Sequence, residues 1–212
     1  MIKSLIGITL FSVIACGVWA QQQDQSAPQG DEKSSAGLLG KNYVDVGLFT
    51  ERFRNTDSKS GYGTALDLNL PAFDNLDIGL NYAFERVASN PQLTDNTLGT
   101  SFTGYFSAGS VKPFVDLDLG YAWQRSKLSG ISTRNDRGIY GAGAGLELPV
   151  SASTAFTGRA AYDNSFRRGS QHAWVYTASV DHNITDGIAT QINVSFQAKN
   201  STVYDVGVVF FF

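Results

Sequence analysis

The sequence predicts an all-β protein, an antiparallel transmembrane β-barrel of about ten strands. Apolar and small polar residues alternate along almost all of residues 43–212, which assigns one kind to each face of every strand. No apolar run in that region approaches the roughly 20 residues that a spanning helix needs. The composition, with 22 glycines, one Cys and a net charge of -3, points away from helical bundles, disulfide scaffolds and general nucleic-acid binders.

The first 42 residues differ from the rest. Residues 1–20 have the pattern of a signal peptide, with Lys3, a short apolar run and the cleavage pattern Val18-Trp19-Ala20. The run 13–16 also resembles a lipobox, which would make Cys16 a lipidated first residue; we favour cleavage after Ala20. Residues 21–42 are polar and lack aromatic residues, so we expect a flexible tail ahead of a barrel over 43–212.

The strand count follows from the period-two segments. Tyr62 to Leu70 and Leu76 to Phe84 place large apolar residues at every second position except Thr64, on either side of a turn-forming Pro71–Asn75 segment, which predicts a hairpin. Continuing in this way gives ten segments with short connections. Ten strands of about 11 residues fit the available length, and the alternative of eight strands fits less well.

The composition of the two faces indicates which one lies inside. A soluble sandwich also alternates, but here the polar face carries mostly Gly, Ala, Ser, Asn and Asp, a poor soluble core that suits a polar lumen. The apolar face must then meet lipid. Its aromatic residues fall toward one rim, as an interfacial girdle requires: Tyr82, Phe84, Tyr121, Trp123, Tyr140, Tyr162, Trp174, Tyr176 and Tyr204.

The C-terminal residues carry a family resemblance. Asp205-x-Gly207-x-x-Phe210-x-Phe212 resembles the β-signal that Gram-negative outer-membrane proteins present to their barrel-assembly machinery. With the export signal and the alternation, the chain resembles small outer-membrane β-barrels of the OmpA, OmpX and opacity type, although their commonest members have eight strands. The resemblance implies an outer-membrane location, Gly207, Phe210 and Phe212 as the assembly signal, and both termini in the periplasm.

That orientation sorts the connections and the charges. Short periplasmic turns are expected near 71–75, 108–113, 149–155 and 183–187, and outer loops near 55–59, 88–96, 125–137, 166–172 and 199–201. Most of the 16 Lys and Arg residues then fall at the outer rim. Guanidinium groups clamp phosphates, so we expect lipopolysaccharide contact there, the alternative being a rim that only keeps the loops soluble. The candidate rim residues are Arg125, Arg134, Arg137, Arg167 and Arg168.

The predicted lumen is acidic, with Arg159 as the one clear inward cation. Its carboxylates are Asp45, Asp67, Asp77, Asp116, Asp118, Glu147, Asp181 and Asp205. One interpretation is a narrow cation-preferring pore for small solutes, in which inward glycines leave space. The other, which we favour, is a closed polar core in which the carboxylates bond to Arg159 and to Asn and Ser neighbours.

No catalytic, metal or cofactor site is expected. Asp116, Asp118 and the Asp181-His182 pair lie near periplasmic turns, with Asp181 and His182 on opposite faces, and His172 has no neighbouring residue that would activate it. The sequence thus favours a monomeric barrel with a structural or surface-interaction role, in contact with lipids, lipopolysaccharide and, during biogenesis, the assembly machinery. The pore stays open as the alternative.

Overall fold

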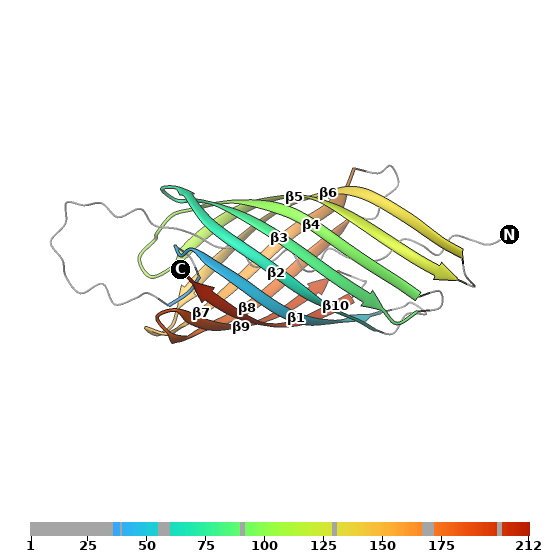
Figure 1. The fold of residues 1–212 in the computed structure, drawn as a ribbon. Coiled ribbons are helices and arrows are strands. Elements are labelled where there is room, and N and C mark those ends of the chain that lie inside the picture. Colours follow the sequence, from blue (N-terminus) through green and yellow to red (C-terminus); the bar gives the residue numbers. More distant parts are fainter. Residues whose placement is uncertain are drawn as a thin grey trace.

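The computed structural model describes residues 36–38, 40–54, 60–89, 92–128, 131–166, 172–198 and 201–212. Ten β-strands form one closed barrel in this part of the chain (Figure 1). The strands are β1 (Tyr43–Phe53), β2 (Ser60–Phe73), β3 (Leu76–Val87), β4 (Gln92–Tyr105), β5 (Lys112–Leu128), β6 (Ile131–Pro149), β7 (Thr154–Ser165), β8 (Ala173–Thr185), β9 (Ile188–Gln197) and β10 (Ser201–Phe211).

The barrel is a simple up-and-down meander. Each strand pairs antiparallel with its neighbours in sequence, and β1 closes the sheet by pairing with β10, with Gly47 opposite Gly207. Closure removes both sheet edges, so the backbone groups of the strands are satisfied within the barrel wall. The predicted ten-stranded antiparallel barrel is confirmed, and the alternative of eight strands is excluded.

The two faces of the wall are divided as the alternation predicts. On β5, Leu117 is 59% exposed on the outside, whereas Asp118 is 4% exposed inside. Aromatic residues bound the outer apolar band at both ends: Tyr121 and Trp123 lie toward one end, and Phe73 and Phe106 toward the other. The polar side chains are therefore enclosed and the large apolar ones face out, the arrangement that a lipid surrounding requires. Within the described residues, no helix is long and apolar enough to cross a membrane.

The two ends of the barrel differ in form. We call the end that holds Tyr43 and Phe212 the terminal end, and the opposite one the distal end. At the terminal end the turns are tight, and Asn75 adopts a left-handed φ of 61° between β2 and β3. At the distal end the long hairpin of β5 and β6 projects beyond the other strands (Figure 1).

Two of the predicted outer loops are largely strand in the structure. Residues 92–96 begin β4, and residues 125–128 and 131–137 belong to β5 and β6, so most of the expected loops 88–96 and 125–137 are strand. These segments are polar on both faces, which hides the period-two signal. A ladder of backbone hydrogen bonds needs no apolar side chains once a neighbouring strand has fixed its register.

The segment before β1 also differs from the expectation. Ala36 and Leu38, placed in a flexible tail, are 1% and 3% exposed. Leu38 packs with inward-facing residues of five strands at the terminal end. An apolar side chain that finds such neighbours gains enough burial to offset its ordering entropy. The predicted signal peptide and residues 21–35 lie outside the described residues.

A charge placed in the outer apolar band tests the orientation of the wall. Leu117→Arg should lower the free energy of unfolding in lipid vesicles by about 2–4 kcal/mol, because an arginine near the bilayer midplane is poorly solvated. The measurement is urea unfolding followed by tryptophan fluorescence. Ile131→Arg is the matched control, since Ile131 is 71% exposed at the distal tip of β6 and should tolerate the charge. Equal losses in both variants would contradict the assignment of the band.

Candidate functional site

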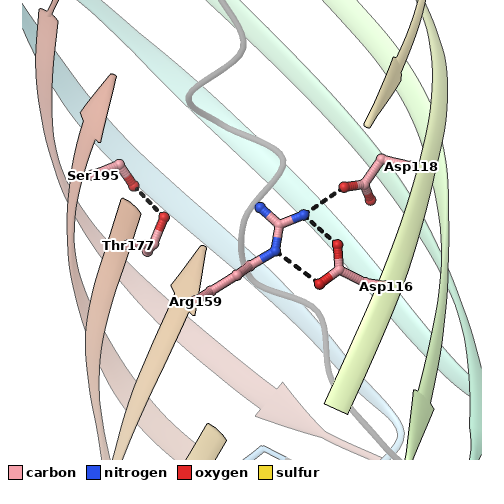
Figure 2. A network of polar contacts seen from close by, with 5 residues as sticks. All are labelled: Asp116, Asp118, Arg159, Thr177 and Ser195. Carbon is pink, nitrogen blue, oxygen red and sulfur yellow. Dashed lines mark hydrogen bonds and ion pairs between the residues drawn. The ribbon is translucent and has the colours of Figure 1, made fainter. Parts of the chain in front are cut away.

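The centre of the lumen is organised around one buried arginine. Arg159 on β7 is 9% exposed, and its Nε donates to Oδ2 of Asp116 at 2.9 Å. Its Nη2 donates to the second oxygen of Asp116 and, at 2.7 Å, to Oδ2 of Asp118 (Figure 2). Asp116 and Asp118 point to the same side because they are two residues apart on β5. The arginine therefore links β7 to β5 across the intervening strand β6 and pairs the charges buried there.

The structure places every predicted lumen carboxylate on the inner face, six of them at most 6% exposed. It adds four more that the sequence analysis missed: Glu51, Glu85, Asp95 and Asp163, all at most 5% exposed. Position parity could have found Glu51, Glu85 and Asp163, because each lies an even number of residues from an inward residue already identified on its strand: Asp45, Asp77 and Arg159, respectively. All four lie toward the distal half of the barrel.

Amide side chains hold several of the other carboxylates. Near the terminal end, Asn69 donates to Oδ2 of Asp77 at 2.5 Å, and Gln191 donates to Oδ1 of Asp181 at 2.7 Å. Asn193 donates to Oδ1 of Asp205 at 2.8 Å. The hydroxyl oxygens of Thr177 and Ser195 lie 2.9 Å apart, on the wall opposite Asp116 and Asp118 (Figure 2). These bonds satisfy three of the lumen carboxylates through neighbouring amide side chains.

Two further cations point inward. Arg137 on β6 lies 3.3 Å from Oδ2 of Asp95, which also accepts from Nε2 of Gln124 at 3.4 Å. Lys112 lies 3.3 Å from Glu147. The expectation of Arg159 as the one inward cation is therefore wrong, and so is the placement of Arg137 on the lipopolysaccharide-facing rim. Arg137 shares the parity of the inward residue Ile139 on β6, so its side chain enters the barrel.

Inward glycines make room for side chains of the neighbouring strands. A Cβ on Gly145 would meet the Phe114 ring and the carbonyl oxygen of Gly158, and one on Gly143 would lie 2.7 Å from an oxygen of Asp116. Phe114 and Gly145 are direct cross-strand partners. The sequence analysis took inward glycines as possible space for a pore. In the structure that space holds side chains lying along the wall.

The outer surface of the distal end carries a row of basic residues. The register aligns Arg86 of β3, Thr94 of β4, Arg125 of β5 and Arg134 of β6 side by side. All four strands present these residues on the outward face, and Lys127 follows two positions after Arg125. We call Arg86, Arg125, Lys127 and Arg134 the basic row. Arg167 and Arg168 lie outside the described residues.

The basic row lies next to the aromatic girdle. Trp123 is two residues before Arg125, and its ring centroid lies 6.5 Å from that of Tyr82 and 6.2 Å from that of Tyr121. Asp136, opposite Trp123, accepts a hydrogen bond of 2.6 Å from Nε of Arg134. The basic row therefore lies two residues farther along the strands than the aromatic rings that mark the boundary of the apolar band.

The two histidines lie apart from these clusters. His172 stacks on Tyr162 with ring centroids 5.6 Å apart, and Nδ1 of the exposed His182 lies 3.0 Å from Oγ1 of Thr154. His182 faces outward while its neighbour Asp181 faces inward, so the two do not converge. In the ranges that the structure describes, no group of three His, Cys, Asp or Glu residues is placed to hold a metal ion.

Comparison with solved structures agrees with this architecture. The β domain of the Bordetella autotransporter BrkA aligns with a TM-score of 0.52 at 10% identity, over 81% of this chain and all of that one. The translocator domain of the autotransporter NalP from Neisseria meningitidis aligns with a TM-score of 0.50 at 11% identity, over 82% of this chain and 89% of that one. The fold is that of an outer-membrane β-barrel.

Other comparisons add little on function. Neisserial surface protein A aligns with a TM-score of 0.47 at 14% identity, over 80% of this chain and 96% of that one. No family model matches the sequence, and no curated protein matches it. At such identities the likeness concerns the fold alone, so any role for this chain has to be argued from its own residues.

Removing the buried guanidinium should weaken the barrel strongly. Arg159→Met leaves Asp116 and Asp118 buried without their cation, and we expect a loss of about 3–5 kcal/mol in the free energy of unfolding. Adding Asp116→Asn and Asp118→Asn to that variant should recover most of the loss, because the uncompensated charges are then gone. Urea unfolding in vesicles measures both. A triple variant no more stable than Arg159→Met would contradict this account.

Substitution of two glycines on adjacent strands tests whether inward glycines leave room that neighbouring side chains need. Gly145→Val should lower stability by about 1–3 kcal/mol, since the new side chain overlaps Phe114 and the wall. Gly158→Val is the matched control, because a Cβ on Gly158 meets nothing within 4 Å. The readout is the temperature at which the folded band is lost in a heat-dependent gel shift. If the two variants lose the folded band at similar temperatures, the close packing of Phe114 over Gly145 does not contribute to stability.

Proposed function

We propose that this chain resides in the outer membrane of a Gram-negative bacterium and acts there through its outer surface, where the basic row contacts the phosphates of lipopolysaccharide. The observation that carries the proposal is the register of Arg125 directly opposite Arg134 on the outward face. Like charges directly opposite on adjacent strands destabilise a sheet. An anion lying between them removes that cost.

The chemistry of the row suits a phosphate group. Arginine forks donate two parallel hydrogen bonds to phosphate oxygens. Arg86 extends the positive surface beyond Thr94 onto β3, and Lys127 extends it along β5. The row lies just beyond aromatic rings that prefer the level of lipid headgroups. Asp136 neutralises part of the charge of Arg134, so the row retains a net positive charge for a ligand.

The interior supports a structural role better than a transport role. The carboxylates near the centre are paired by Arg159, and the glycines seat neighbouring side chains. The residues of the β-signal resemblance complete the proposal. Phe210 and Phe212 are 46% and 68% exposed on the outer face at the terminal end, where the assembly machinery would meet them, while Gly207 seats the carboxylate of Asp45. We infer a monomer with no catalytic step.

The proposed contact is tested by neutralising the two facing arginines. The Arg125→Gln/Arg134→Gln variant should retain about fivefold less lipopolysaccharide phosphate per barrel after purification from outer membranes, because both guanidinium forks are lost. Asp136→Asn should act in the opposite direction, since it frees Arg134 from its carboxylate. Phosphate analysis of the purified protein gives the ratio, and a heat-dependent gel shift verifies the fold.

A control variant with the same change in charge separates the row from the rim in general. Arg52→Gln/Arg54→Gln removes two arginines at the distal end of β1, outside the basic row. This control should keep its lipopolysaccharide within about twofold of the unchanged protein. Equal loss in both double variants would reduce the row to a general basic rim. Unchanged retention in Arg125→Gln/Arg134→Gln would refute the contact.

A further inference from the structure

The terminal mouth of the barrel contains an apolar cluster inside an otherwise polar lumen. Leu38, which comes before β1, packs there against inward-facing residues of the wall. The buried members of the cluster are Leu38, Tyr43, Tyr105, Phe114, Ala189 and Val209, with Leu76 and Phe211 packed against them. The wall residues belong to β1, β4, β5, β9 and β10, so the cluster spans the mouth instead of lining one side of it.

The chain leading into β1 is held at several points. Gly37, at a φ of +107°, lies so close to the Glu147 carboxylate that a Cβ on it would be 2.6 Å from Oε1. Nδ2 of Asn69 donates to the carbonyl of Lys41 at 3.3 Å. Nζ of Lys41 lies 4.4 Å from the centroid of the Phe211 ring. Burial lowers the pKa of Lys41, and the nearby Glu147 carboxylate acts in the opposite direction. These contacts come from opposite sides of the mouth.

The apolar composition of this cluster contrasts with the lumen behind it. The described interior carries carboxyl groups on nearly every strand, and four of them pair with the inward cations: Glu147 with Lys112, Asp95 with Arg137, and Asp116 and Asp118 with Arg159. Twelve inward carboxyl groups face these three cations, so acidic groups outnumber basic ones in the described interior. Apolar side chains that span the mouth hinder ions, because an ion cannot shed its hydration shell against them without compensation.

We propose that residues 36–38 and 40–42 form a stopper that closes the terminal mouth, and that displacing Leu38 turns the barrel into a cation-preferring channel. The inward-facing aromatic residues are the seat, and Leu38 is the side chain that fills it. The excess of carboxylates behind the seat sets the preference for cations once the mouth is open. This inference does not depend on lipopolysaccharide contact at the distal end.

Thiol labelling of the refolded chain, from residue 21 onward, tests whether the stopper is seated. The protein then has no native cysteine, since the chain's one Cys is Cys16. Leu38→Cys should react with a charged thiol reagent at least about tenfold more slowly than Ala152→Cys, which lies on an exposed turn at the same end. Equal rates in protein shown to be folded by its heat-dependent gel shift would overturn the proposal.

Planar-bilayer conductance under a salt gradient tests whether the stopper is the barrier. Leu38→Asp should raise the conductance per inserted barrel about tenfold or more, with a reversal potential that favours cations, because the charged side chain cannot stay in the apolar seat. Leu38→Met, which conserves volume, should stay within about twofold of the unchanged protein. A folded Leu38→Asp protein that is as silent as the unchanged one would refute the barrier, as would full conductance in the unchanged protein.

Discussion

The closed hydrogen-bonded wall is the constraint on which the rest of this molecule depends. A sheet in lipid has no water to satisfy its backbone, so β1 must meet β10, and the register is then fixed around the whole ring. Successive side chains then alternate between the two faces, with the large apolar ones outside and the small and polar ones inside. The interior therefore inherits the charged and amide residues, and they have to be satisfied by one another. Arg159 does so at the centre, and Asn and Gln side chains do so near the terminal end.

Much of this could be predicted from the sequence, because strand faces are a local property. Alternation identified the strands, their number and eight of the lumen acids, among them Asp45 and Asp205. It failed where both faces are polar, as at the distal ends of β5 and β6, since no contrast then marks a strand. Arg137 was misplaced for the same reason, because a residue assigned to a loop cannot be assigned to the inner or outer face of a strand. Leu38 was missed because a single leucine within a polar segment gives no periodic signal, and its partners come from five distant strands.

Parity also separates the roles of similar residues. Arg134 and Arg137 are three positions apart on β6 and therefore lie on opposite faces. Arg134 is exposed beside Asp136 on the outer surface, whereas Arg137 reaches a buried carboxylate inside. The same guanidinium thus serves a surface in one case and the internal charge balance in the other. A count of basic residues near the rim cannot distinguish them, but the strand register can.

The two ends of the barrel differ in which residues occupy the outward and inward positions. At the distal end the wall continues past the aromatic girdle, so its outward positions can carry charge at the level of lipid headgroups, and facing arginines there favour an anion between them. At the terminal end short turns join the strands, and apolar inward residues such as Tyr105, Phe114 and Val209 lie beside inward polar pairs. Apolar residues facing a polar lumen would expose greasy surface to water unless something covers them, and Leu38 does so. The apolar cluster of the wall and Leu38 therefore depend on each other, because each would expose apolar surface to water without the other.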